Sequence, residues 1–269
     1  MPYEFHTDPQ KYLELLVNNT RKSSLPFIMN HQPGGKTQIS DLKILELGCG
    51  EGGNLQPFAE KGAHCIGMDL ECNKIEHGKS IMKTWIDQGN MELFCGNIFD
   101  PEWSNKFQGK FDLIILKDVI EHIPSKLEAL QNMRNYLSPN GLIFIGWPPY
   151  YMPFGGHQQI AKNKWLKKLP WIHLLPRGVY GWFLKKFDET PSMQEELLEI
   201  HDLRVTINQM NGYLKPAQLR LVASKFYFIN PIYEDKFGLK TRVLWKPLTA
   251  IPILRDFMTT SCYYLLGKK

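Results

Sequence analysis

The sequence predicts an α/β protein built on a mostly parallel sheet with helices on both faces. Short apolar segments alternate with amphipathic helical segments through the first 150 residues of the chain. The first apolar segment, residues 42–47, is typical of a strand buried on both faces. It runs directly into a glycine-rich turn, as strands of parallel sheets do where they bind ligands.

The predicted elements follow one another in a regular order. A helix over residues 8–24 begins at Asp8 and Pro9, which provide a cap and a proline in the first turn. A polar linker at residues 31–36 leads into the first strand. Strands are predicted at residues 42–47, 63–68, 91–95, 111–116, 142–147, 226–230 and 261–266, and helices at residues 54–61, 71–87, 125–137, 216–225 and 251–258. This alternation predicts right-handed crossovers and a ligand at the carboxyl ends of the strands.

The composition is that of a globular protein with one large core. Apolar residues make up 43% and charged residues 22% of the 269 residues, and the net charge of +5 says little about partners. No apolar run is long enough to cross a bilayer, and the N-terminus does not read as a signal peptide, so we expect a cytoplasmic protein. The cysteines are scattered without a Cys-x-x-Cys pair, which predicts reduced thiols and no metal site: Cys49, Cys65, Cys72, Cys95 and Cys262.

The glycine-rich turn predicts a cofactor site but does not by itself identify the cofactor. Gly48, Gly50 and Gly53 match the spacing of a dinucleotide site. Together with Gly52, the same turn also has the form Glu46-x-Gly-x-Gly-x-Gly. Glycines allow positive φ angles and let a ligand approach the backbone, which both kinds of site require.

Acidic residues at the ends of the first two strands favour a cationic cofactor. Glu46 would lie beneath the ligand, where a carboxylate repels a pyrophosphate but suits the ammonium and sulfonium of S-adenosylmethionine. Asp69 ends the second strand about 20 residues after the glycines, where a carboxylate can accept hydrogen bonds from both ribose hydroxyls. For Asp69, a simple helix-capping role remains the alternative.

Four segments in register resemble one known family, the class I (Rossmann-like) S-adenosylmethionine-dependent methyltransferases. The resemblance covers residues 42–147 and includes the glycine turn, Asp69, the segment 111–123 and the segment 137–145. It implies a Rossmann-like, seven-stranded, mostly parallel sheet, S-adenosylmethionine as cofactor and S-adenosylhomocysteine as product. In that framework residues 1–269 form a single domain, with a core at 40–147 and 212–269 and an acceptor-site insertion or lid at 148–211.

The resemblance also implies roles for individual residues. Glu46, Gly48 and Gly50 would contact the methionine moiety, Asp69 the ribose, and Asn97 and Ile98 the adenine. The full predicted set of cofactor contacts is Glu46, Gly48, Cys49, Gly50, Asn54, Asp69, Leu70, Asn97, Ile98 and Lys117. Asn97 stands where the family usually has an acidic residue, and a role as a turn residue remains open.

The predicted insertion is rich in aromatic and basic residues. From residue 129 to 187 there is no Asp or Glu, while Lys and Arg accumulate. We predict that His122, Tyr150, Tyr151 and Phe154 line the acceptor pocket. The charge has three interpretations: a solvated helix face, a pocket for an anionic acceptor, or a contact surface. Residues 165–186 mix Trp, Leu and Lys as membrane-surface segments do, whereas nucleic acid is disfavoured by the absence of an RNA-binding module.

Methyl transfer requires alignment of acceptor, methyl group and sulfur, and a hydroxyl acceptor also needs a base. His157, after a flexible Gly-Gly pair, and Asp118 are the predicted catalytic residues. The favoured function is O-methylation of an aromatic, sugar-derived or lipid-like small molecule in a biosynthetic pathway. A methyltransferase acting on RNA or another macromolecule, and a degenerate cofactor-binding or structural protein, remain as alternatives. The sequence does not predict the oligomeric state.

Overall fold

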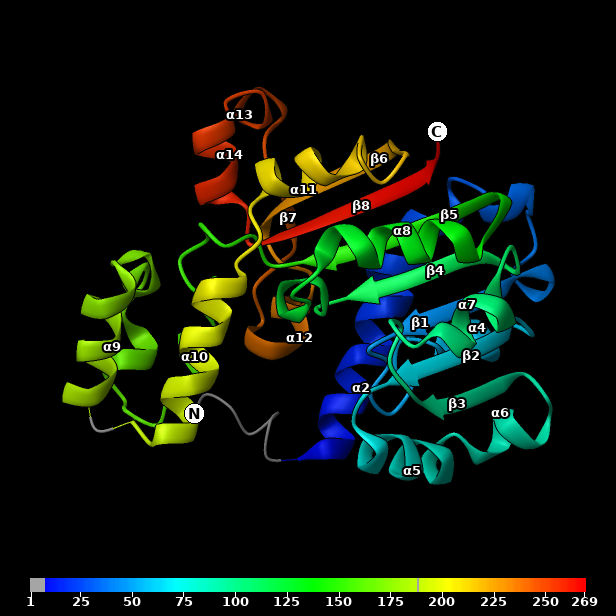
Figure 1. Cartoon of the computed structure of the whole chain (residues 1–269), viewed down its shortest axis with the longest axis horizontal. Coiled ribbons are helices and arrows are strands. Elements are labelled where there is room, and N and C mark those ends of the chain that lie inside the picture. The colour runs from blue at the N-terminus through cyan, green and yellow to red at the C-terminus, as the bar shows by residue number, and fades with distance from the viewer. Residues whose placement is uncertain (1–7, 188) are drawn as a thin grey trace.

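The computed structural model describes residues 8–187 and 189–269. Within these residues the chain forms an eight-stranded sheet in the order β3-β2-β1-β4-β5-β8-β6-β7 (Figure 1). The strands are β1 (Lys43–Leu47), β2 (His64–Asp69), β3 (Met91–Cys95), β4 (Phe111–Lys117), β5 (Leu137–Trp147), β6 (Leu219–Ile229), β7 (Arg242–Val243) and β8 (Ser261–Lys268). Neighbouring strands among β1–β5 pair in parallel, whereas β8, β6 and β7 add antiparallel pairings. The α/β, mostly parallel fold predicted from the sequence is confirmed.

Helices cover both faces of the sheet. They are α2 (Pro9–Asn19), α3 (Leu25–Met29), α4 (Gln56–Ala59), α5 (Cys72–Ile81), α6 (Lys83–Asp87), α7 (Pro101–Phe107), α8 (Lys126–Tyr136), α9 (Arg177–Lys186), α10 (Pro191–Leu203), α11 (Ile207–Leu214), α12 (Ile232–Phe237), α13 (Lys246–Thr249) and α14 (Pro252–Met258). Apolar side chains of α7, α8 and α11 pack on one face of the sheet. Those of α2, α3, α4 and α5 pack on the other. None of the described helices has the length and apolar content that crossing a bilayer requires.

The central strands position the site. Every residue of β4 is buried between β1 and β5, as expected for the middle of a parallel sheet covered on both faces. The parallel register pairs Leu47 with both Met68 and Leu116. The carboxyl ends of β1, β2 and β4 therefore meet at one edge, and the loops that leave them face the same side.

The helices α9 and α10 lie beyond the ends toward which the arrows of β1–β4 point (Figure 1). They have a small apolar core of their own, which includes Leu166, Tyr180 and Leu197. The buried carboxylate of Glu189 accepts hydrogen bonds from the backbone amides of Lys162 (3.0 Å) and Asn163 (2.8 Å). This carboxylate therefore fixes the irregular segment before α9 to the start of α10.

The sequence prediction is wrong for the segment after residue 215. A helix was expected at residues 216–225, but the chain enters β6 at Leu219 and continues to Ile229. Antiparallel pairing with β8 extends from Leu219 to Tyr227, with a register shift between Leu221 and Ala223. That irregularity breaks the period of two in the burial pattern, so alternation did not reveal the strand. The two-residue β7 raises the strand number from the expected seven to eight.

Other elements differ at their boundaries. The helix expected at residues 71–87 is interrupted at Met82, whose φ of −87° and ψ of 10° leave the helical range. Strand β5 begins at Leu137, ahead of the turn expected at residues 138–141. The N-terminal helix continues past residue 24, through a π-helical turn at Thr20–Ser24, into α3. The short helix α7 was not predicted.

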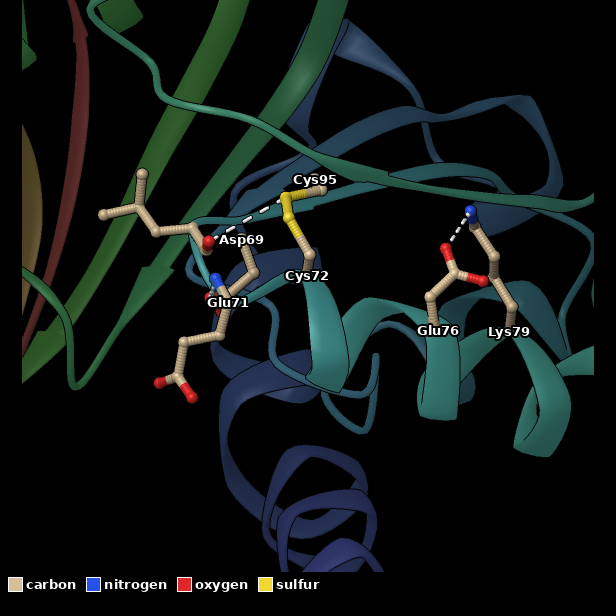
Figure 2. The surroundings of a disulfide bond; sticks show 7 residues. Asp69, Glu71, Cys72, Glu76, Lys79 and Cys95 are labelled. Atoms are coloured by element: carbon tan, nitrogen blue, oxygen red, sulfur yellow. Dashed lines mark hydrogen bonds and ion pairs between the residues drawn. A yellow bond between two sulfur atoms is a disulfide. The ribbon is translucent and has the colours of Figure 1, made fainter.

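Two cysteines correct the expectation of reduced thiols. Cys72, the first residue of α5, forms a disulfide with Cys95, the last residue of β3 (Figure 2). Both residues are exposed, whereas Cys49, Cys65 and Cys262 are free and buried. Sequence spacing gave no sign of this bond because its partners are separated by 23 positions and become neighbours only when β2 and β3 pair.

The disulfide gives a direct prediction. Alkylation of the unfolded chain without a reductant should label only Cys49, Cys65 and Cys262, because the other two sulfurs are bonded to each other. Reduction should lower the free energy of unfolding by about 2–4 kcal/mol, since the bond closes a medium-length loop. Mass spectrometry counts the labels and urea unfolding measures the free energy. Labelling of all cysteines without a reductant would contradict the assignment.

Candidate active site

A cavity of about 1210 Å³ opens at the carboxyl ends of the parallel strands. Its walls come from the ends of β1, β2 and β4, the loop after β3, the N-terminal helix α2 and the insertion helix α10. Of the residues predicted from the sequence to contact cofactor or acceptor, these line the cavity: Gly48, Cys49, Gly50, Asn54, Asp69, Leu70, Asn97, Ile98, Lys117, Asp118 and His122.

The glycine turn forms the floor of the cavity. Gly48 and Gly50 have φ angles of 70° and 54°, which side chains other than glycine rarely adopt. A Cβ atom at Gly48 would overlap the side chain of Val119, which follows β4. A Cβ atom at Gly50 would have nothing within 4 Å. The turn thus packs tightly against β4 at Gly48 and presents bare backbone to open space at Gly50.

Asp69 joins the glycine turn to the second strand. Its carboxylate accepts a hydrogen bond from the Gly50 amide at 2.7 Å and one from the Glu71 amide at 2.9 Å. The second bond closes a turn ahead of α5, whose N-cap residue is Glu71 and which has no side-chain cap bond, so Asp69 is not the cap of this helix. Figure 2 shows Asp69 beside the disulfide, in which Cys95 Sγ lies 3.8 Å from the Leu70 carbonyl oxygen. A carboxylate oxygen can accept more than one bond, so ribose hydroxyls can still bind here.

Glu46 lies beneath the cavity and does not form part of its wall. Its Oε1 accepts a hydrogen bond from Asn54 Nδ2 at 2.8 Å, and Asn54 Oδ1 accepts from Thr20 and Lys117. Burial raises the pKa of Glu46 to about 8, although Asn54 and Lys117 oppose that rise. Burial also lowers the pKa of Lys117. Glu46 Oε2 is buried and has no hydrogen-bond partner among the described residues. A cationic ligand in the cavity would complete the bonding of this oxygen.

Residues on the predicted adenine side lie at the loops after β2 and β3. Leu70 is exposed and Ile98 is buried, and both line the cavity. Asn97 Oδ1 accepts a hydrogen bond from the Phe99 amide at 3.0 Å. Asn97 is therefore a turn residue, as one of the two interpretations held, and it also borders the cavity.

Asp118 and His122 lie at the carboxyl end of β4. Asp118 has a φ of 55°, an uncommon left-handed conformation that Asp and Asn tolerate better than most residues. Its carboxylate faces the cavity, where the enclosing protein raises its pKa while Lys117, Lys236 and His122 oppose the rise. Burial lowers the pKa of His122, and Glu199 and Asp118 oppose that shift. The cavity therefore contains a carboxylate and an imidazole that can accept a proton.

His157 lies behind His122 and outside the cavity wall. The two imidazole rings have centroids 5.3 Å apart, and His157 Nε2 lies 3.8 Å from Glu121 Oε1. Burial lowers the pKa of His157 to about 4, with the nearby imidazoles of His122 and His173 acting in the same direction. Both carboxylate oxygens of Glu121 are buried without a hydrogen-bond partner among the described residues, and burial raises its pKa well above the usual value. Ligand atoms of Glu121, His122 and His157 lie within 4.8 Å of one another, a cluster that the sequence analysis, which expected no metal site, did not identify.

The aromatic residues predicted for the acceptor pocket lie elsewhere. Tyr150 is buried and donates its hydroxyl hydrogen to the His173 carbonyl oxygen at 2.7 Å. Tyr151 is exposed and its ring stacks on Phe257 of α14. Neither these two residues nor Phe154 lines the cavity. Sequence position just after β5 did not reveal that the chain turns away from the site, because the insertion packs on itself.

Sequence reasoning missed wall residues from two helices. Tyr12 and Leu16 of α2 close one side of the cavity. Burial, together with the nearby Asp118 carboxylate, raises the pKa of the Tyr12 hydroxyl to about 12. Glu196 and Glu199 of α10 reach it from the insertion. The sequence did contain one signal for these two residues: they are three positions apart, which places both carboxylates on one face of a helix.

The fold and cavity together define an α/β protein that binds a nucleoside-containing cofactor, with an acidic and glycine-rich turn suited to a cationic one. A family model described as "Methyltransferase domain" matches residues 13–188, more than half of the chain. The chain therefore belongs to this methyltransferase family, and it is a class I S-adenosylmethionine-dependent methyltransferase.

Individual relatives are more distant. The chain is 26% identical over 200 residues to a ubiquinone biosynthesis O-methyltransferase of Bartonella bacilliformis, covering 71% of this chain and 73% of that protein. It is 26% identical over 225 residues to the mitochondrial ubiquinone biosynthesis O-methyltransferase of Homo sapiens, covering 74% of this chain and 53% of that protein. The chain thus spans about half the length of the human protein.

Solved structures share the fold. A geranyl diphosphate methyltransferase in complex with SAM has a TM-score of 0.57 at 12% identity, covering 92% of this chain and 85% of that chain. PKMT2 from Rickettsia typhi in complex with AdoHcy has a TM-score of 0.52 at 18% identity, covering 86% of this chain and 50% of that chain. At these identities the likeness supports the Rossmann-like architecture.

Asp69 is the residue whose loss should most weaken cofactor binding. We expect Asp69→Ala to reduce affinity for S-adenosylhomocysteine by roughly hundredfold, because charged hydrogen bonds each contribute about 1.5–3 kcal/mol. The variant also loses the bond that fixes Gly50. Isothermal titration calorimetry measures the affinity. Glu76→Ala is the matched control, because Glu76 lies on the adjacent α5, pairs with Lys79 and lies outside the cavity wall. Equal affinities for Asp69→Ala and wild type would exclude Asp69 from the site.

The buried Glu46 predicts how stability depends on pH. Its pKa is about 8 in the folded chain and near 4.5 when exposed, so between these values unfolding releases its proton. The free energy of unfolding should therefore fall as the pH rises through this window, with a contribution of up to about 1.4 kcal/mol per pH unit. Glu46→Gln should flatten this part of the curve in urea unfolding at pH 5 to 8. Parallel curves for the two proteins would show that Glu46 is ionised in the folded state.

Proposed function

We propose that this chain transfers a methyl group from S-adenosylmethionine to a hydroxyl group of a neutral small molecule, with an aromatic, sugar-derived or lipid-like skeleton. The relatives named ubiquinone biosynthesis O-methyltransferases support oxygen as the acceptor atom. The observation that carries the proposal is the lining of the cavity, which includes Asp69, the glycine turn, Asp118 and His122.

The size of the cavity supports two ligands side by side. A volume of about 1210 Å³ exceeds the range of about 300–1,000 Å³ that is usual for one drug-sized ligand. Cofactor contacts are proposed for the part between Asp69 and Lys117, where the polar groups described above converge. The acceptor then occupies the part between Asp118, His122 and α10, where proton-accepting groups lie.

The charge of the acceptor part favours a neutral molecule. Glu128, Glu196 and Glu199 line this part, whereas the basic residues of the insertion from Lys162 to Lys186 do not. An anionic acceptor would face these carboxylates at close range, and the like charges would weaken its binding. The interpretation of the insertion as a pocket for an anion is therefore not the one we propose.

Each residue has a role that follows from its position. The bound cofactor supplies an electrophilic methyl group on a sulfonium. Glu46, through the network with Asn54 and Lys117, places hydrogen-bonding groups beneath the methionine moiety. Asp118 accepts the hydroxyl proton of the acceptor, because it faces the cavity and has a raised pKa that makes it a stronger base. His122 lies beside it, and His157 orients His122 from behind.

Three further expectations belong to this proposal. Residues 148–211 act as the acceptor-site insertion, since α10 contributes to the cavity wall. Residues 165–186, with exposed Trp165 and Trp182, contact a membrane surface. Cytoplasmic residence stays a prediction, and the Cys72–Cys95 disulfide stands against it, because disulfides persist mainly in oxidising compartments.

Methyl transfer to defined acceptors tests the function. We expect label from methyl-labelled S-adenosylmethionine to appear on the hydroxyl of a neutral catechol such as a dihydroxybenzoate ester, or on another neutral phenol or sugar. The free dihydroxybenzoate should have a kcat/KM lower by roughly fivefold or more, because it meets the carboxylates of the acceptor part. Chromatography with mass spectrometry identifies the product. Label found only on amines, protein or RNA from a host extract would refute the proposal.

Two variants test the roles of Asp118 and His157 in the same assay. Asp118→Asn retains the tolerance for positive φ and should lower kcat by roughly 10²-fold or more. His157→Ala should lower kcat less and leave the affinity for S-adenosylhomocysteine within about twofold, because it lies outside the cavity wall. The control is His64→Ala, which replaces a partly exposed histidine at the opposite end of β2. Unchanged turnover of both variants would remove them from the mechanism.

A further inference from the structure

The short helix α14 has its polarity reversed. A surface helix ordinarily buries its apolar residues and exposes its charged ones. In α14 the buried residues are Arg255 and Asp256, whereas Ile253 is 72% exposed and Leu254 and Phe257 also face solvent. The helix therefore presents its apolar side to the outside.

The buried charges are firmly held, so the orientation of α14 is fixed. Arg255 bonds the Asp256 carboxylate at 2.9 Å and Asn208 of α11 at 2.8 Å. Its guanidinium also lies over the ring of Phe226 in β6, 5.6 Å from the centroid. Rotating α14 to bury its apolar side would break the hydrogen bonds of Arg255 and Asp256, and breaking a buried ion pair is strongly destabilising.

Neighbouring segments extend the apolar side into a surface. Trp245, just before α13, is 70% exposed, and Ile251 between α13 and α14 is exposed as well. We call the residues Trp245, Ile251, Ile253, Leu254 and Phe257 the α13–α14 surface. Figure 1 shows α13 and α14 at one end of the molecule, away from α4, α5 and α6.

The charges around this surface are mostly positive. Lys240, Arg242 and Lys246 are exposed beside it. From residue 237 to the last residue of the sequence the only acidic residue is Asp256, which is buried against Arg255. The surface thus combines exposed tryptophan and aliphatic side chains with an excess of lysine and arginine, next to one exposed carboxylate, Glu234 of α12, which accepts hydrogen bonds from Thr241.

The surface continues onto the insertion. The ring of Tyr151 stacks on Phe257 with a centroid distance of 5.3 Å, and the backbone oxygen of Tyr151 accepts a hydrogen bond from the Trp171 indole at 3.1 Å. Both residues are exposed. They belong to the stretch 129–187 that contains no acidic residue, so the excess of positive charge extends across the junction.

We propose that the α13–α14 surface docks the protein on an anionic lipid bilayer, with the apolar side chains inserted at the level of the headgroups and the basic residues on the lipid phosphates. Mixed aromatic, aliphatic and basic residues are the composition of interfacial helices, and basic residues bind anionic leaflets. A second copy of this chain is a poorer occupant, because a symmetric interface would bring together two surfaces on which basic residues outnumber carboxylates. This docking requires no methyltransferase activity.

Vesicle sedimentation with the full chain tests the proposal. Wild type should bind vesicles of equimolar phosphatidylcholine and phosphatidylglycerol and bind pure phosphatidylcholine vesicles much more weakly. The double variant Ile253→Ser/Leu254→Ser should bind the anionic vesicles roughly tenfold more weakly, because it removes two inserted side chains. Lys240→Glu/Lys246→Glu should reduce binding at least as much, since each reversed charge costs roughly fivefold.

Controls separate this surface from others. Leu221→Ser removes an exposed apolar side chain on β6 and should bind as wild type does. All variants should unfold thermally as wild type does, because the substituted side chains are exposed. The proposal is overturned if wild type does not bind anionic vesicles, or if Ile253→Ser/Leu254→Ser binds them as tightly as wild type. It is also overturned if light scattering without lipid shows a wild-type dimer that this double variant dissociates.

Discussion

The hydrogen bond from the Gly50 amide to the Asp69 carboxylate is the contact on which the site depends. It ties the turn after β1 to the end of β2, two strands whose parallel register already brings these points together. Because Gly50 holds a positive φ angle there and a Cβ would meet open space, the backbone is available to a ligand. The same carboxylate fixes the entry to α5 through Glu71. The disulfide then links the first residue of α5 to the end of β3. One acidic side chain therefore organises the backbone around the proposed nucleoside position.

Beneath this contact lies a buried polar network that would be costly without a ligand. Burial alone disfavours both ionised Glu46 and ionised Lys117, and the shifted pKa values show that each moves toward its neutral form. Asn54 bridges the two and is itself held by Thr20 of the π-helical turn after α2. The N-terminal helix is thus connected to the floor of the cavity as well as forming part of its wall. A polar network that is only partly satisfied is typical of a site prepared for a ligand.

Sequence reasoning found what local patterns encode and missed what tertiary contacts decide. The buried strand β4, the glycine turn and Asp69 were predictable because each has a signature within a few residues. The second part of β6 was predicted as the strand at residues 226–230, but its first part was not, since pairing with β8 overrides local preference and the register shift hides the alternation. The pairing of Cys72 with Cys95, and the arrival of Glu196 and Glu199 at the cavity, depend on segments that are distant in sequence. The position of Tyr150 after β5 suggested a pocket residue, but its hydroxyl bonds the insertion itself.

The distribution of charge gives the molecule two distinct sides. Carboxylates of α8 and α10 border the acceptor part of the cavity, while the basic residues of the insertion and of the α13–α14 surface lie outside it. Residues 129–187 contain no acidic residue. From residue 237 onward the single acidic residue is Asp256, which is buried in an ion pair with Arg255. Such segregation lets one chain hold a cationic cofactor in a negative cavity and still approach an anionic surface. If the two charge sets were mixed, the carboxylates would oppose docking and the lysines would oppose binding of the cofactor.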